Sequence, residues 1–139
     1  MKHLPVVLFV VLLITPATAQ GTLSGTVAHV RDGDTIEVGD VPIRLNGVAA
    51  PELDEPRGRE ARQFMVRLVA GRTVRCDLNG ERSYDRVIGV CHLDGQDIGA
   101  AIIGAGLARD CPRFSKGKYD EFNTAESKQL PLPGYCVRR

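Results

Sequence analysis

Four charged residues have the types needed for metal-assisted chemistry on a phosphate diester. Asp34 lies in V-R-D-G-D-T-I, Arg44 and Glu52 lie in I-R-L-N-G-V-A-A-P-E, and Arg86 lies in S-Y-D-R. A carboxylate beside a glycine turn suits a hard cation, which prefers oxygen ligands. Arginines offer forked donors that match phosphate oxygens. The set is therefore suited to attack on a phosphodiester by a water molecule beside a metal ion.

Each of the four residues also has a purely structural explanation. Asp34 alone is explained by a turn, because Asp and Gly favour turns for their own reasons. Arg44 alone is explained as a solvated strand residue, and Glu52 and Arg86 as surface charges of little energetic value. In the functional interpretation, Glu52 is a general base toward the attacking water. Arg86 then stabilises the charge that grows on phosphorus.

Residues 1–19 are predicted to be a signal peptide. A short basic start precedes the apolar stretch Val6–Ile14, and Ala17-Thr18-Ala19 has the small residues of a cleavage site. The alternative, a retained membrane anchor, requires a longer apolar stretch. The mature chain is then residues 20–139, one domain that is secreted or periplasmic and has no membrane association after cleavage.

The charge balance excludes nucleic-acid binding through bulk electrostatics. The whole chain has 18 basic and 17 acidic residues, and removal of the leader removes Lys2, which leaves 17 of each. Any binding of phosphate must therefore come from local placement of arginines. Nothing in the sequence indicates a protein partner.

Four cysteines predict disulfides, because an even number is typical of small exported domains. Three pairings are open. We favour Cys76–Cys91, since both lie in strand-like runs that would form one hairpin, with Cys111–Cys136 attaching the C-terminal tail. Zinc is the alternative, but the sequence has no Cys-x-x-Cys pair and only two histidines after processing.

The hydrophobic pattern predicts an α+β fold. The expected elements are strands at 25–30, 35–38 and 43–48, a helix at 57–69, strands at 73–78 and 87–93, and helices at 98–107 and 119–128. Asp97 is expected to cap the helix at 98–107, and Asn79-Gly80 is expected in a loop between the last two strands. This order fits a five-stranded OB-fold barrel with three helices.

Taken together, the motifs resemble those of the thermonuclease, or staphylococcal-nuclease-like, family. They are V-x-D-G-D-T, a strand I-R-L followed by x-x-P-E, and Y-x-R before an apolar strand, and they fall within about Gly25 to Leu107. The resemblance implies an OB-fold barrel with three helices that hydrolyses DNA and RNA phosphodiesters with calcium. It assigns calcium binding to Asp34 and the backbone carbonyl of Ala50, phosphate contacts to Arg44 and Arg86, the general base to Glu52, and a place in the nucleotide pocket to Tyr84.

One position departs from the family pattern. Ala49 stands where the family usually has an aspartate that binds calcium. Water could fill that place, Asp32 or Asp54 could substitute, or metal binding could be lost. Two hypotheses follow: a calcium-dependent nuclease that acts on nucleic acid, or a nuclease-like module that binds nucleic acid, a sugar polymer or a partner protein without cleavage.

Overall fold

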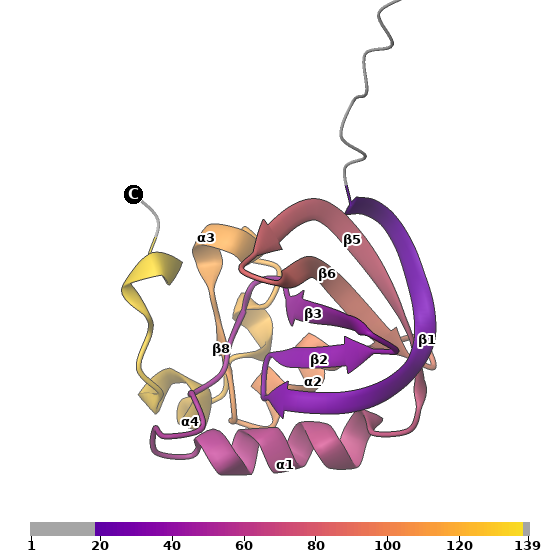
Figure 1. Ribbon diagram of the computed structural model, residues 1–139. Coiled ribbons are helices and arrows are strands. Elements are labelled where there is room, and N and C mark those ends of the chain that lie inside the picture. Colours follow the sequence, from indigo (N-terminus) through magenta and orange to yellow (C-terminus); the bar gives the residue numbers. More distant parts are fainter. Residues whose placement is uncertain (1–18, 138–139) are drawn as a thin grey trace, which may run out of the picture.

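Five strands close into a barrel in the computed structural model, which describes residues 19–137 (Figure 1). Strands β1 (Ala19–Asp32), β2 (Thr35–Val38) and β3 (Val41–Leu45) form a meander, and β5 (Thr73–Ser83) pairs with β6 (Arg86–Leu93). β1 also pairs with β5, and β3 runs parallel to β6, which closes the ring in the order β3-β2-β1-β5-β6. The predicted OB-type barrel is confirmed.

The predicted signal peptide lies outside the described residues, except that Ala19 begins β1. Its presence and cleavage stay predictions. Within residues 19–137, none of the helices has the length and the apolar character needed to cross a membrane.

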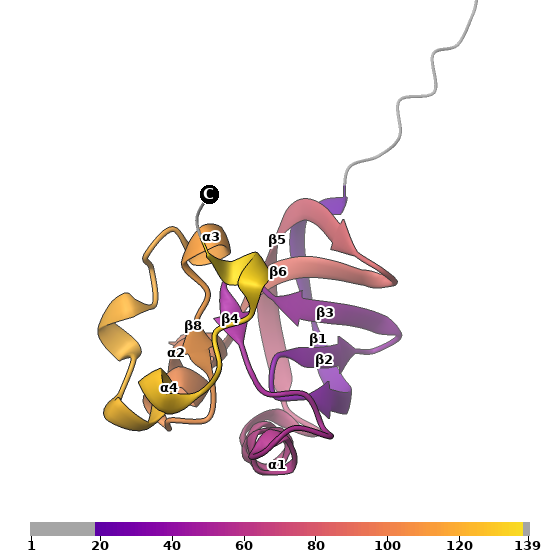
Figure 2. The ribbon, with the colours of Figure 1, turned by 90° about the vertical axis from the view of Figure 1, so that its left-hand side faces the viewer.

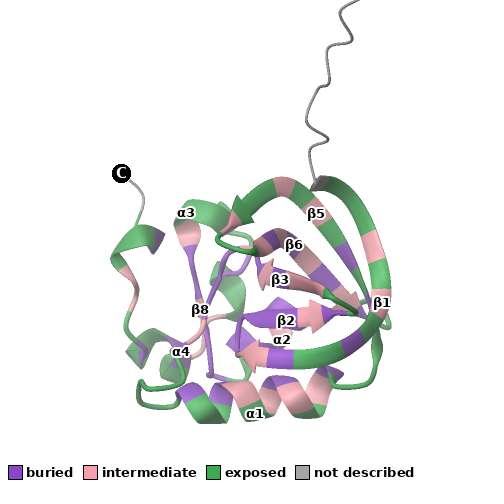
Figure 3. Cartoon of the chain, viewed as in Figure 1, coloured by how far each residue is buried: buried purple, intermediate pink, exposed green. Residues whose placement is uncertain are grey.

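Helix α1 (Gly58–Val69) lies across one end of the barrel (Figure 1). The predicted apolar stripe is confirmed, because Ala61, Met65 and Val69 are fully buried while Arg59 and Arg67 are exposed. The stripe packs on the inward-facing residues of the strands, and together they form the main core (Figure 3). This packing fixes the segment that precedes α1 against the barrel.

The remaining elements gather on one side of the barrel (Figure 2). They are β7 (Gln96–Asp97), α2 (Ile98–Gly104), α3 (Pro112–Ser115), α4 (Ala125–Gln129), the 3-10 turns η1 (Asp120–Phe122) and η2 (Gly134–Cys136), and a ribbon of β4 (Val48–Ala49) with β8 (Arg109–Asp110). The ribbon joins this side to the strand that carries Arg44.

Both favoured disulfides are present. Cys76 and Cys91 are directly opposed across β5 and β6, with a Cα–Cα distance of 4.0 Å. Cys111 is bonded to Cys136 and holds the C-terminal tail against the start of α3. Two disulfides are typical of a protein that folds in an oxidising compartment.

The predicted helix at 119–128 is wrong as a single element. It is divided into η1 and α4 by the extended residues Asn123 and Thr124. The Asn123 side chain accepts a hydrogen bond from the Asp110 backbone N–H at 3.0 Å, and Thr124 caps α4 through the Ser127 N–H at 3.1 Å. These side-chain bonds compete with a continuous helix. Residues 19–137 contain four α-helices rather than the expected three, because α3 was not predicted.

Two strand boundaries also differ from the prediction. β5 continues through Asn79 and Gly80 to Ser83, with a bulge between Leu78 and Arg82, because β1 is long enough to pair with this stretch. The expected strand at 43–48 breaks at Gly47, whose φ of +74° suits glycine, and it continues separately as β4.

Asp97 connects α2 to the segment that follows it, so we expect Asp97→Ala to destabilise the protein strongly. Its carboxylate accepts hydrogen bonds from Gly99 and Ala100 at 2.8 and 3.1 Å, and from the hydroxyl of buried Tyr119 at 2.9 Å. Loss of the cap and of the tyrosine partner should lower the free energy of unfolding by about 3 kcal/mol. Urea unfolding measures this loss, with the exposed Asp94→Ala as a matched control; equal midpoints would contradict the prediction.

Candidate active site

A buried ion pair joins two of the predicted site residues. Asp34 lies in the turn just before β2 and Arg44 lies on the neighbouring strand β3, and Arg44 Nη2 is 3.3 Å from Asp34 Oδ2. The same carboxylate oxygen accepts a hydrogen bond from the Ala50 backbone N–H at 3.0 Å. Arg44 Nη1 also donates to the carbonyls of Leu45 and Val48, each at 2.7 Å. The pair therefore fixes the start of β2, the end of β3 and the chain that leads away from β4.

Thr35 connects Arg86 to this pair. The Thr35 hydroxyl donates to Asp34 Oδ1 at 3.2 Å and accepts from Arg86 Nη1 at 3.1 Å. Arg86 also donates to the backbone carbonyl and the hydroxyl of Ser83, at 3.3 and 3.0 Å. The register explains the contact, since Thr35 is opposite Arg44 in β2–β3 and β3 runs beside β6. Sequence reasoning missed both hydroxyl residues, although Thr35 lies inside the D-G-D-T run.

Glu52 reaches the same cluster from the loop before α1. Its backbone carbonyl accepts from the Glu55 N–H at 3.0 Å, and the loop passes directly over Gly58. A Cβ atom at Gly58 would lie 1.7 Å from the Glu52 carbonyl oxygen. Only glycine permits this approach, so Gly58 fixes the backbone that carries the Glu52 side chain.

Shifts in pKa show that the charges act on one another. Burial raises the pKa of Asp34 to about 7; Arg44 lowers it and Asp32 raises it further. Glu52 is exposed as a whole residue, but its carboxyl group is partly buried. This partial burial is the largest cause that raises the pKa of Glu52. Asp32 and Glu55 also raise it, while Arg44 and Arg86 lower it. All four predicted residues therefore meet in one electrostatic cluster.

The two arginines are held mainly by neutral acceptors. Arg86 bonds to hydroxyl and carbonyl oxygens of Thr35 and Ser83 and forms no ion pair within residues 19–137. An arginine side chain has five N–H donors, so some donors stay free for a ligand. The arrangement orients both guanidinium groups, and it leaves the positive charge of Arg86 without an ion-pair partner among the described residues, as an oxyanion ligand requires.

Ala49 lies in an apolar surrounding. It is 3% exposed and packs with the Cys111–Cys136 disulfide and Leu132. Its backbone pairs with Arg109 in the β4–β8 ribbon. The position that the family usually gives to an aspartate is thus packed beneath the C-terminal tail of this chain.

The oxygen donors near Asp34 suit a hard cation, although few of these donors are charged. Asp34 offers a carboxylate and Ala50 a backbone carbonyl, the donor type that calcium prefers. Asp32 is adjacent, and its Oδ1 accepts from the Asp34 N–H at 3.0 Å. Asp54 instead lines a separate hollow with Arg59 and Arg62. Among residues 19–137, no group of three or more His, Cys, Asp or Glu side chains could hold a metal ion.

Tyr84 projects into solvent at the tip of the β5–β6 hairpin. It is 94% exposed, its φ is +57°, and the Arg86 guanidinium lies 5.8 Å from the centre of its ring. An exposed aromatic ring beside an arginine can stack on a base. The exposure of Tyr84 excludes a role in filling the core.

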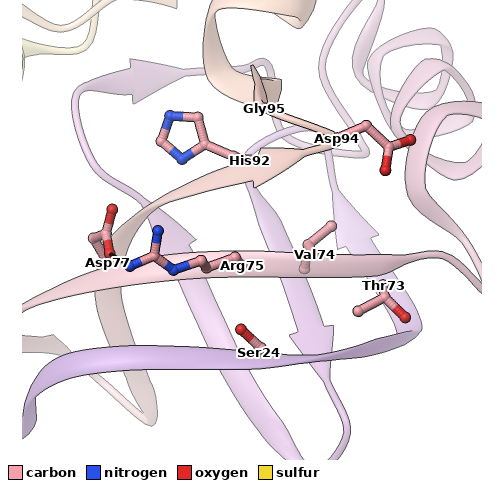
Figure 4. A pocket seen from close by; sticks show the side chains of 8 residues that line it. All are labelled: Ser24, Thr73, Val74, Arg75, Asp77, His92, Asp94 and Gly95. Carbon is pink, nitrogen blue, oxygen red and sulfur yellow. Dashed lines mark ion pairs between the residues drawn. The ribbon is translucent and has the colours of Figure 1, made fainter.

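A hollow of about 400 Å³ lies at the opposite end of the same hairpin (Figure 4). Its walls include Thr73 at the start of β5 and His92 near the end of β6, whereas Arg86 begins β6. Arg75 and Asp77 form an ion pair there at 3.7 Å. This hollow contains none of the predicted site residues.

The fold and the site define an OB-fold protein with a charged cluster on its barrel. The family model described as Staphylococcal nuclease homologue matches residues 42–129, which is more than half of the chain. The chain therefore belongs to the staphylococcal nuclease family.

Relatives carry several names. An Escherichia coli protein named as an uncharacterized endonuclease is 34% identical over 128 residues, covering 88% of this chain and 76% of the relative. The succinoglycan biosynthesis protein ExoI of Rhizobium meliloti (strain 1021) is 38% identical over 104 residues, covering 66% and 54%. The staphylococcal-like nuclease CAN1 of Arabidopsis thaliana is 30% identical over 94 residues, covering 65% and 28%.

We expect Gly58→Ala to displace the Glu52 loop. The added methyl group would overlap the Glu52 carbonyl, so the loop or α1 must shift, with a loss of about 2 kcal/mol in the free energy of unfolding. Gly104→Ala is the matched control, because a Cβ there meets no atom within 4 Å and alanine favours the helix. Urea unfolding of both variants tests this; an equal effect of the two substitutions would contradict it.

Proposed function

We propose that this chain is an exported, calcium-dependent nuclease that hydrolyses phosphodiester bonds of DNA or RNA. The observation that carries the proposal is the connected set Arg44–Asp34–Thr35–Arg86, with Glu52 in the same electrostatic cluster. Family membership and the printed names of relatives support it. Export is supported by the predicted leader and by the two disulfides.

The geometry supports the following roles. Free N–H groups of Arg44 and Arg86 bind the phosphate oxygens and stabilise the charge that develops on them. Glu52 accepts the proton of the attacking water. Its pKa is raised above the ordinary value, which makes the carboxylate a better proton acceptor. Asp34 and the Ala50 carbonyl would hold calcium, which supplies further positive charge beside the phosphate. Tyr84 would stack on a base.

We expect the purified, oxidised mature chain to cleave DNA or RNA in calcium and to stop when EGTA is added. Replacing Arg86 by alanine should lower kcat by about 100-fold or more, because it removes a donor to the developing charge. Release of acid-soluble nucleotides from single- and double-stranded DNA and from RNA measures both effects.

Arg75→Ala is the matched control for this experiment, because Arg75 is an exposed arginine at the other end of the same hairpin. Cleavage at full rate in EGTA would refute the calcium requirement. Full activity in Arg86→Ala would refute the proposed site.

A binding module without cleavage is the second candidate, and the surroundings of Ala49 favour it. The missing carboxylate has been replaced by a methyl group that packs on the Cys111–Cys136 disulfide. One relative is named for succinoglycan biosynthesis rather than for a nuclease. On this interpretation the arginines bind a phosphate or another anionic group of a polymer, and the site lacks the cation needed for turnover.

Ala49→Asp separates the two candidates. In EGTA we expect it to lower the free energy of unfolding by about 2 kcal/mol, because it buries a carboxylate among apolar groups. For the nuclease, we expect it to lower the calcium concentration for half-maximal cleavage by about tenfold, since calcium affinity rises with the number of charged ligands.

Ala49→Asn is the control, since it adds a polar group of similar size without the charge. Thermal unfolding with and without calcium and cleavage rates over a calcium series provide the measurements. If neither the natural chain nor Ala49→Asp cleaves while the folded protein still binds oligonucleotide, the binding module replaces the nuclease.

A further inference from the structure

Asp110 is a buried carboxylate outside the site described above. The residue is 4% exposed, and its Oδ1 has no hydrogen-bond partner; within residues 19–137 it is the only buried side-chain oxygen or nitrogen in this condition. Buried polar atoms are almost always paired, because an unpaired one loses its hydration without compensation. This carboxylate group therefore requires a partner.

The backbone at Asp110 is fixed by its neighbours. Asp110 pairs with Val48 in the β4–β8 ribbon, and its N–H donates to Asn123 Oδ1 at 3.0 Å. The next residue, Cys111, donates its N–H to the Gly47 carbonyl at 2.9 Å and is bonded to Cys136. The main chain that carries the carboxylate is thus held in place from both sides.

Asp110 borders a hollow of about 400 Å³. Its strand, β8, lies on the side of the molecule that carries α2, α3 and α4 (Figure 2). Asp120 and Asn123 line the same hollow. Neither Asp110 nor Asp120 forms an ion pair within the described part of the chain. Two carboxylates and an amide therefore share a space in which neither carboxylate has an ion-pair partner among the residues that the structure describes.

Nearby cationic side chains are bound elsewhere. Arg109 also lines the hollow, but its Nη1 donates to the backbone carbonyls of Lys128 and Leu130 at 3.3 and 2.9 Å. Lys118 pairs with Asp97 at 3.3 Å. Neither of these two cationic side chains forms an ion pair with Asp110, although Arg109 keeps its positive charge at the hollow.

We propose that Asp110, Asp120 and Asn123 form a calcium site separate from the active-site cluster. The side-chain donors are oxygen atoms, which hard cations prefer, and the hollow has room for the waters that complete a calcium shell. Two carboxylates and one amide form a weak site, with a Kd of about 0.1–1 mM, the range of extracellular calcium modules. Calcium there would connect β8 to the η1 segment and stabilise the C-terminal part of the chain. The proposal does not depend on nuclease activity.

Calcium titration of the mature, oxidised protein tests this site. An Asp34→Asn background removes the proposed active-site ligand, so that calcium binding by calorimetry and the shift in Tm report on Asp110 alone. We expect this background protein to bind one calcium ion and to gain roughly 4 °C in Tm at tenfold excess over Kd. Adding Asp110→Asn should weaken binding more than tenfold and abolish the shift. Asp120→Asn should weaken binding as a second, independent variant.

Stability in EGTA distinguishes a cation site from a structural carboxylate. Without calcium, Asp110→Asn should be at least as stable as its parent, because the change removes an unpaired buried charge. Asp94→Asn, an exposed carboxylate paired with Arg72, is the matched control and should leave calcium binding unchanged. A Tm lowered by Asp110→Asn in EGTA, together with equal calcium binding by both proteins, would show that Asp110 binds a buried water instead and would overturn the proposal.

Discussion

The buried ion pair between Arg44 and Asp34 is the constraint on which the candidate site depends. Arg44 contacts the carbonyls of Leu45 and Val48, and Asp34 accepts the Ala50 N–H, so one pair fixes three separate segments. A buried pair adds little net stability compared with apolar residues, but removing one partner leaves an uncompensated charge and costs several kcal/mol. Its main effect is therefore geometric: it holds the oxygens of Asp34 and the donors of Arg44 in one place.

The sequence predicted the features that depend on local pattern. The alternating strands gave the barrel, the apolar period gave the buried stripe of α1, and the two strand-like runs with Cys76 and Cys91 gave the hairpin disulfide. Long-range pairing decided the rest. Asn79-Gly80 has the composition of a turn, yet β1 extends far enough to pair with it as strand. The helix expected at 119–128 was divided because Asn123 bonds to Asp110, a contact between residues 13 apart in sequence.

The residues of the candidate site also divide into those that the sequence pattern predicted and those that depend on long-range pairing. Asp34, Arg44, Glu52 and Arg86 were identifiable from motif order, and the structure brings them together. Thr35 and Ser83 were not identified, because a hydroxyl residue in a strand has no distinguishing pattern until its register is known. Asp110 gave no signal either, since a single aspartate becomes unusual only when its burial and its missing partner are seen.

Under the proposed function, a mature chain with no predicted net charge binds its anion through a local arrangement of charges. Arg31, Arg72 and Arg75 are paired with carboxylates at the surface, which cancels their fields. Arg86 is instead oriented by the oxygens of Thr35 and Ser83, which accept hydrogen bonds without neutralising the guanidinium. The positive charge of Arg86 therefore acts mainly on its immediate surroundings. Affinity for phosphate would then arise from one local site, which favours recognition of a single diester over a long electrostatic contact along the polymer.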